Sequence, residues 1–233
     1  MHSVKGSRVT KPKVKKARRV SGTRTRIAPG RSPNNEPLPL VERTNALSIE
    51  EFKSQYAPSD EKSNSEDTAV DIYSAATIST SDLEACLDLV EQTSGEAYSA
   101  SSSGWSRPKK RKEMKLPDMK YLIVRGTSAD EPSGREVSGF LSFMVTYEDG
   151  KEVVYCYEIH LSPRARGRGI GKMLMERMEG VWSGCRVGES NAVATRFYER
   201  LGYGVDEYSP GPRRLRNGTV KDPDYLILSK GLK

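Results

Sequence analysis

An arginine- and glycine-rich loop is the part of the chain whose residue types and spacing best suit chemistry. It reads Arg166-Gly167-Arg168-Gly169-Ile170-Gly171-Lys172 and lies between an apolar strand pattern and an amphipathic helix pattern. Glycines let the backbone approach a ligand closely and adopt left-handed dihedral angles. The first amides of a helix point toward a bound anion, and the nearby cations add attraction. The loop predicts a site for a phosphate-bearing cofactor, with an ordinary tight turn as the alternative.

Other common catalytic and phosphate-binding motifs do not fit this chain. A Rossmann motif needs a βαβ crossover, whereas Asp149-Gly150 predicts a hairpin between the strands before the loop. A P-loop needs GxxxxGK[ST], which is absent from the sequence. A Ser/His/Asp triad would depend on His160, because the only other histidine is His2, and His160 lies inside a strand pattern.

Glu158 is the candidate general base. It lies in the largely apolar strand pattern 152–161, directly before the glycine-rich loop. A carboxylate on such a strand is either paired or functional, and it would take a proton directly or through a water. Strict alternation predicts two faces for this strand: Tyr155, Tyr157, Ile159 and Leu161 on one, and Cys156, Glu158 and His160 on the other.

The patterns around this strand predict one mixed α/β domain over residues 38–233, a mostly antiparallel sheet flanked by helices. Ser48 and Glu51 form a capping-box pattern, and Thr80 or Ser81 would cap the second helix. Leu174, Met178 and Val181 would face the sheet from the helix after the loop. The predicted helices are 41–56, 82–98, 105–116, 169–181 and 191–201, and the predicted strands are 121–124, 137–147, 152–161, 203–208 and 225–229.

The charge distribution separates a basic tail from a mildly acidic body. Residues 1–31 hold 11 Lys and Arg and no Asp or Glu, which leaves 27 basic and 31 acidic residues in 32–233. Residues 1–37 have almost no large apolar side chains, so we expect a disordered tail. The run 11–19 resembles a nuclear localisation signal that an import receptor would bind, and a merely solvated tail is the alternative. The acidic body favours a cationic partner, and it argues against DNA binding as the main function.

The remaining composition argues against several classes of protein. Cys86, Cys156 and Cys185 are scattered, with no CxxC pair, so we expect neither a disulfide framework nor a metal site. No apolar run approaches the roughly 18 residues of a membrane span, and the polar N-terminus lacks a signal-peptide core. We therefore expect an intracellular protein with no membrane partner.

Two motifs in this order resemble those of the GCN5-related N-acetyltransferases. Arg166-x-x-Gly169-x-Gly171 matches the family's R/Q-x-x-G-x-G/A signature, and the second motif is Asn191-x-x-Ala194-x-x-Phe197-Tyr198-x-x-x-Gly202-Tyr203. The resemblance implies the GNAT fold and acetyl-CoA as co-substrate. Its pyrophosphate would lie on the amides of Arg166 to Lys172. Its pantetheine would pair with Ile159, His160 and Leu161, and Asn191 would contact it from the following helix.

The strand from Tyr155 to Leu161 makes the resemblance specific to one subgroup of this family. Its sequence, Tyr-Cys-Tyr-Glu-Ile-His-Leu, is similar to the YCYE-x-x-L strand of NatD-type N-alpha-acetyltransferases, which acetylate the N-terminal Ser of histones 2A and 4. The resemblance runs from about residue 40 to 229. The other matching segments are Leu47-Ser48-x-Glu50-x-Phe52, Tyr98 with Gly104-Trp105, Lys112-Glu113-Met114, Tyr121-Leu122-Ile123 and Asp206-Glu207-x-Ser209-Pro210.

This resemblance implies roles for the polar residues. Tyr98, Glu148, Tyr157 and Tyr225 would line a channel for a Ser-Gly-Arg-Gly N-terminus, and Glu148 would pair with its Arg. Tyr157 and Glu158 would serve the α-amine, whose pKa is about 8. Tyr198 would protonate the departing thiolate. Packing explains the tyrosines equally well, and a turn position explains Glu148.

The sequence departs from the family between the two motifs. The family has a loop and a full strand there, whereas only residues 182–190 separate the predicted helix from Asn191. We therefore expect the fifth strand of the sheet to be truncated or absent. Ser103 stands where the family has Trp, and Thr146 where it has an acidic residue.

These observations favour a histone N-alpha-acetyltransferase in the nucleus and cytoplasm. Three alternatives stay open. The protein is a GNAT transferase for another amine, a catalytically impaired protein that binds CoA or chromatin, or a nucleic-acid binder that acts through its tail. The oligomeric state is not indicated.

Overall fold

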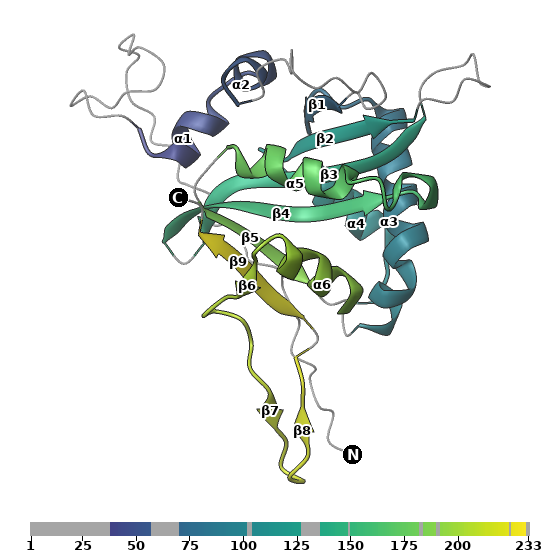
Figure 1. The fold of residues 1–233 in the computed structure, drawn as a ribbon, viewed down its shortest axis with the longest axis vertical. Helices are drawn as coiled ribbons and strands as arrows, with labels where there is room; N and C mark the ends of the chain where they lie inside the picture. Colours follow the sequence, from purple (N-terminus) through teal and green to yellow (C-terminus); the bar gives the residue numbers. More distant parts are fainter. Residues whose placement is uncertain are drawn as a thin grey trace.

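The computed structural model describes residues 38–56, 70–101, 104–126, 136–148, 150–181, 184–189, 192–223 and 225–231. The predictions for the tail 1–37 and for Asn191 lie outside these residues. The described part is a seven-stranded sheet between two layers of helices, as the sequence patterns predicted for the fold class (Figure 1). None of its helices is long and apolar enough to cross a membrane.

The sheet has the order β1-β2-β3-β4-β5-β9-β6. Among the described strands, β4 and β5 pair in parallel and every other neighbouring pair is antiparallel. The edge strand β1 was not predicted from the sequence. The strands are β1 Val70–Ser74, β2 Lys120–Arg125, β3 Val137–Glu148, β4 Lys151–Leu161, β5 Gly184–Glu189, β6 Gly204–Val205 and β9 Leu226–Gly231.

The helices cover both faces of the sheet. Helices α1, α2, α5 and α6 pack against one face, and α3 and α4 pack against the other. Their bounds are α1 Leu40–Asn45, α2 Ile49–Tyr56, α3 Thr80–Ala100, α4 Arg107–Met114, α5 Ile170–Glu179 and α6 Ala192–Arg200, and a short 3-10 helix, η1, spans Pro163–Ala165.

The local signals for helix ends were partly correct. The predicted helix 41–56 is two helices. The second begins directly after Ser48, whose amide and hydroxyl donate to the Glu51 carboxylate and whose Oγ accepts from the Glu51 amide, which is a capping box. The predicted caps of α3 are wrong. Ser79 is the N-cap, and its Oγ accepts a hydrogen bond from the Asp82 amide at 3.0 Å.

The predicted absence of the fifth strand is wrong. Strand β5 occupies Gly184–Glu189 and pairs over its whole length with β9. A six-residue strand is only about 20 Å long, so the few residues between α5 and α6 are enough for it. The pairing of β5 with β4 is short, as a truncated strand would give: only Val154, Tyr155 and Cys156 of β4 pair with β5.

A β-bulge in β4 changes the predicted faces of that strand. Ser142 of β3 pairs with Glu158, and Phe143 pairs with Cys156, so Tyr157 is the extra residue between them. Side chains beyond the bulge therefore swap faces. Glu158 and His160 point toward α3 together with Tyr157, whereas Ile159 and Leu161 pack on the α5 side.

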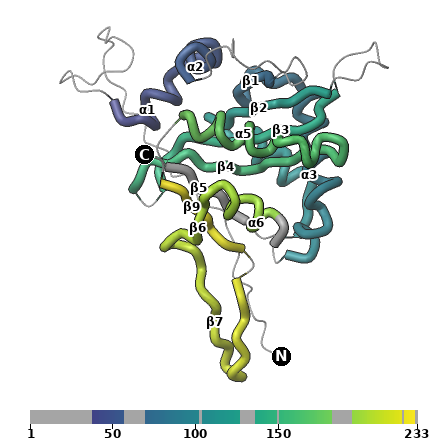
Figure 2. The backbone as a smooth tube through the Cα atoms, in the orientation of Figure 1, coloured from purple at the N-terminus to yellow at the C-terminus, as the bar shows by residue number. Residues whose placement is uncertain are grey.

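A second sheet lies apart from the first. Strands β7 (Arg213–Arg214) and β8 (Val220–Lys221) form a two-stranded ribbon that projects away from the domain (Figures 1 and 2). The ribbon was not predicted, although Asn217-Gly218 at its tip is a hairpin signal.

The absence of a side chain at Gly139 allows β3 to lie close to the end of β4, and this close approach can be tested. A Cβ at this position would lie 2.4 Å from Leu161 Cδ2 and 3.1 Å from the His160 carbonyl oxygen. We predict that Gly139→Ala lowers the free energy of unfolding by roughly 1–3 kcal/mol, because the Leu161 side chain must move and the β4 backbone at His160 must give way slightly. Urea denaturation measures this change.

The matched control is Gly126→Ala. Its Cβ would meet Ser138 Cβ at 3.7 Å, which is an ordinary contact, so we expect a change within about 0.5 kcal/mol. Equal effects of the two substitutions would contradict the close approach of β3 and β4 at Gly139.

Candidate active site

The glycine-rich loop forms a backbone site at the start of α5. Gly167 and Gly169 have φ values of +74° and +77°, which side chains with a Cβ rarely adopt. Gly169 is the N-cap and has no side-chain cap, and the first described helical bond of α5 runs from the Met173 amide to the Gly169 carbonyl. The amides of residues 170–172 therefore have no acceptor within the helix.

Charge around these amides favours an anion. Arg166, Arg168 and Lys172 are exposed beside the start of α5, where the helix dipole is positive. The Arg166 Nε donates to the Leu161 carbonyl at 3.1 Å, which ties the loop to the end of β4. Buried Gly171 lies against Phe197 of α6, and an added Cβ would lie 3.3 Å from its ring. The residues present therefore fit a phosphate group.

Strand β4 has an open edge next to this loop. Its pairing with β5 ends at Cys156 among the described residues, five residues before β4 ends at Leu161. Strand β5 instead continues along β9 to Glu189. The two strands thus separate, and the edge of β4 offers backbone donors and acceptors to an extended ligand arm that leads to the amides of α5.

Glu158 is the centre of a buried polar cluster beside this edge. Its side chain is almost fully buried, at 7% exposure. The Oε1 atom accepts hydrogen bonds from the Tyr98 hydroxyl at 2.8 Å and from the Lys110 Nζ at 2.7 Å. The Oε2 atom lies 2.7 Å from the His160 Nε2. The negative charge of Glu158 is therefore stabilised by one buried cation and two polar neighbours.

His160 extends this cluster into α3. Its Nδ1 lies 2.6 Å from the Thr93 hydroxyl, which also lies 2.6 Å from the Leu89 carbonyl oxygen. When Thr93 donates to Leu89, it accepts from His160 Nδ1, and the short contact to Glu158 then requires a proton on either Nε2 or Oε2. When Thr93 donates to Nδ1, the Nε2–H donates to Glu158. Both arrangements hold the imidazole against the carboxylate.

Helix α4 positions Lys110, a site residue that the sequence did not reveal. Arg107 binds Glu84, Asp88 and Glu91 of α3 at 2.5 to 3.2 Å and so fixes the start of α4. At its end, the buried Tyr121 hydroxyl donates to the Met114 carbonyl, and burial raises the pKa of Tyr121 well above its ordinary value. Lys110 and Met114 are four residues apart on one helix face, and both are buried. The four-residue spacing between Lys110 and Met114 was the sequence signal that could have identified Lys110 as a buried residue.

Tyr98 connects the parts of this cluster. Its ring lies 5.7 Å from Trp105, whose Nε1 donates to Glu91 Oε1 at 2.8 Å. This hydrogen bond, and then that from Arg107, lowers the pKa of Glu91. The Lys110 Nζ lies 4.5 Å from the Tyr98 ring centroid and 3.2 Å from its hydroxyl. Tyr98 is therefore held in place from both sides.

The structure brings some of the predicted site residues together and separates others. Tyr98, Tyr157, Glu158 and His160 meet at the bulge, and Ile159 and Leu161 follow it toward the loop. Tyr225 precedes Leu226, which pairs with Glu189 at the end where β4 and β5 separate.

Two predicted residues lie elsewhere. Tyr198 is buried in the core between α6 and the sheet, with its ring 5.7 Å from Tyr203. Glu148 is at the hairpin end of β3, six residues from Ser142, the β3 partner of Glu158. This separation is roughly 20 Å along the strand, so Glu148 does not contact Glu158.

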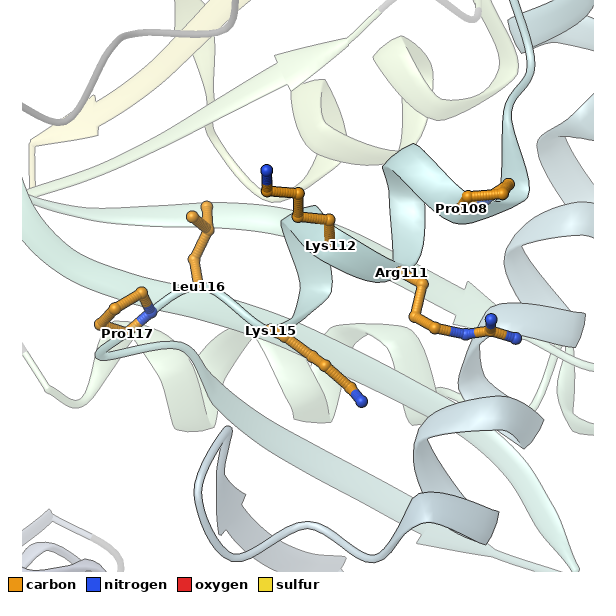
Figure 3. A pocket seen from close by; sticks show the side chains of 6 residues that line it. All are labelled: Pro108, Arg111, Lys112, Lys115, Leu116 and Pro117. Carbon is orange, nitrogen blue, oxygen red and sulfur yellow. The ribbon is translucent and has the colours of Figure 1, made fainter.

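A separate surface hollow lies on the outer side of α4. Its volume is about 450 Å³, and Figure 3 shows the side chains that line it. Lys110 points the other way, into the protein, so the hollow is distinct from the Glu158 cluster. Within the described ranges, no group of three or more His, Cys, Asp or Glu side chains is placed to hold a metal ion. The residues lining the hollow are Pro108, Arg111, Lys112, Lys115, Leu116 and Pro117.

Comparison with known proteins agrees with this arrangement. Residues 124–205, which include the bulge, the loop and α5, match the family model described as an acetyltransferase (GNAT) domain. The segment 124–205 is therefore similar to GNAT acetyltransferase domains.

A curated relative is N-alpha-acetyltransferase 40 of Saccharomyces cerevisiae, which is 29% identical over 186 residues. The alignment covers 62% of this chain, and the chain spans 63% of the length of that relative. Two solved structures also align. Arabidopsis thaliana NAA60 in complex with a bisubstrate analogue has 16% identity and a TM-score of 0.48, over 71% of this chain and 100% of that one. The smu.2055 protein of Streptococcus mutans has 19% identity and a TM-score of 0.49, over 71% and 99%.

The pairing of Lys110 with Glu158 can be measured by a double-mutant cycle on stability. We predict that Lys110→Met destabilises the fold by about 3 kcal/mol or more, because a buried carboxylate loses its cation. Glu158→Gln leaves the cation buried in turn. The double variant is expected to lose much less than the sum of the two single losses.

Lys109→Met is the control for this cycle, because Lys109 is the exposed neighbour of Lys110. We expect it to change the free energy of unfolding by no more than about 0.5 kcal/mol. Additivity of the Lys110 and Glu158 substitutions within about 0.5 kcal/mol would contradict a direct pair.

Proposed function

We propose that the protein is an acetyl-CoA-dependent N-alpha-acetyltransferase. The observation that carries this proposal is the buried Glu158 beside the open edge of β4, which leads directly to the free amides at the start of α5. An extended arm that ends in phosphates fits the edge and the amides. A carboxylate at the other end of that edge is placed to act on an amine.

The chain's own residues supply binding, orientation and proton transfer. The amides of residues 170–172 bind the pyrophosphate, and the backbone of Ile159 to Leu161 pairs with the pantetheine. When bound, acetyl-CoA supplies the acetyl group as a thioester. Glu158 takes a proton from the α-ammonium, directly or through a water, and backbone amides of the 159–161 edge polarise the thioester carbonyl.

The remaining steps form the amide bond and release CoA as a thiol. The amine nitrogen forms a bond to the carbonyl carbon and loses its second proton to solvent, the carbon–sulfur bond breaks, and the thiolate takes up a proton. We propose Tyr198 as the source of that proton; because its side chain is buried between α6 and the sheet, the proton would pass through an intervening water, and Tyr198 would be reprotonated from solvent. Asn191 completes the cofactor contacts from the same motif.

We further propose that the substrates are histone 2A and 4 N-termini beginning Ser-Gly-Arg-Gly. Two small residues would lie beside the bulge, where Tyr98, Tyr157 and Tyr225 are expected to line the channel. The distance to Glu148 is roughly 20 Å along β3, and three extended residues span only about 10 Å. An arginine side chain at the third position would extend along β3 toward Glu148 and cover only part of the remaining distance, so the choice of arginine is carried by the sequence resemblance.

The sequence outside the described residues supports a location in both the nucleus and the cytoplasm. The basic run 11–19 is suited to an import receptor, so we propose that the protein acts in the nucleus as well as the cytoplasm.

The presence of β5 removes the reason for expecting an impaired, non-catalytic protein.

A peptide acetylation assay with mass-spectrometric mapping of the acetyl group tests the proposal. We predict acetylation of the α-amine of a Ser-Gly-Arg-Gly peptide, and a loss of about 10²- to 10⁴-fold in kcat for Glu158→Gln, because the general base is removed. CoA binding should change little, since backbone groups make the proposed cofactor contacts.

Glu207→Gln is the control variant, because Glu207 is an exposed carboxylate that pairs with Lys151. It should keep wild-type kcat. Acetylation of lysine side chains in place of the α-amine would contradict the substrate assignment, and an unchanged kcat in Glu158→Gln would contradict the base.

A further inference from the structure

The two-stranded ribbon β7–β8 is a separate, well-defined arm. Its strands pair Arg213 with Lys221 and Arg214 with Val220. The tip is closed by the Leu215 amide, which donates to the Thr219 carbonyl at 2.8 Å, and Gly218 there has a φ of +84°. Figures 1 and 2 show the arm extending away from the seven-stranded sheet. Residues 211–222 are all exposed.

From Arg213 to Lys221 the arm carries only positive charge, and Asp222 follows at its base. Arg213, Arg214, Arg216 and Lys221 fall within nine residues, and the sequence has no Asp or Glu from Tyr208 to Lys221. This composition contrasts with residues 32–233 as a whole, which hold 27 basic and 31 acidic residues. The cations are therefore concentrated on the arm against the general trend of the body.

The register of the ribbon places like charges opposite each other. Arg213 and Lys221 are direct cross-strand partners, an arrangement that destabilises a hairpin. The ribbon also forms no strand pairing with the main sheet among the described residues. Concentrated cations on an exposed element outside the core are typical of a surface that binds an anionic partner.

We propose that the β7–β8 arm binds duplex nucleic acid through its phosphates. A two-stranded β-ribbon has the width that the major groove of a duplex admits, about 12 Å. Arginine guanidinium groups form paired hydrogen bonds to phosphate oxygens. Leu215 and Val220, which are 38% and 59% exposed, give the ribbon an apolar surface for contact with the groove. This binding is additional to acetyl transfer and does not depend on it.

The test uses the full chain and a 20-base-pair duplex of mixed sequence, with fluorescence anisotropy measured over a range of KCl concentrations. The variant is Arg213→Gln, Arg214→Gln and Arg216→Gln combined. We expect its dependence of log Kd on log salt to be weaker by roughly 2 to 3 than that of wild type, because about one counterion is released per phosphate contact. At 0.1 M salt we expect Kd to rise at least about tenfold.

Two further variants identify the cause of any change. Lys109, Lys112 and Lys115 are exposed on and directly after α4, and replacing all three with Gln removes the same charge from another surface, including the hollow there. The triple Arg→Lys variant of the arm keeps the charge and should keep most of the salt dependence. The basic tail is present in every variant, so its contribution cancels in the comparison.

The outcomes decide the proposal. A weaker salt dependence in the arm variant alone supports duplex binding by the arm. An unchanged salt dependence in that variant, or an equal loss in the α4 variant, overturns it, since the tail or general charge would then explain the binding. No duplex binding by the wild type also overturns it, and would leave an acidic protein surface as the partner. Thermal unfolding of the arm variant should match wild type, because the substituted side chains lie outside the core.

Discussion

Strand β4 stops pairing with β5 at Cys156, five residues before it ends, and the candidate site depends on that separation. A parallel sheet that continued to Leu161 would use every backbone group of β4 internally and leave none for a ligand. The separation instead presents an extended edge in the middle of a sheet, where it is held rigidly by β3 on its other side. Gly139 allows β3 to approach that end of β4 closely, and Arg166 ties it to the loop. The edge and the helix start are thus fixed relative to one another.

The bulge at Tyr157 adds chemistry to this edge. Without the extra residue, Tyr157 and Glu158 would lie on opposite faces of the sheet. With it, both face α3, and Glu158 enters a cluster with Tyr98, Lys110 and His160. Burying a carboxylate and an ammonium is costly unless their geometry is tightly held. The arginine contacts between α4 and α3 supply that restraint. The basic segment 105–116, which was predicted only as a helix, therefore includes one residue of the site.

Much of the fold could be predicted because its signals are local. The loop glycines, the buried residues of α5 and the capping box at Ser48 are features of short segments, and the structure agrees with each. The bulge could not be predicted, since it is a property of the pairing between β3 and β4 and leaves the alternating pattern of β4 unchanged. The error over β5 came from counting residues against the family's longer segment. Lys110 and Thr93 were missed because their roles arise from tertiary contacts between distant segments.

The account's central claim is that the open edge of β4 and the start of α5 together form the cofactor site. Amide hydrogen exchange measured with and without CoA tests it most directly, because bound backbone groups exchange more slowly. The account predicts added protection in residues 157–161 and 167–173, and little change in the β7–β8 arm or in β1. Protection that appears elsewhere while these two segments remain unchanged would contradict it.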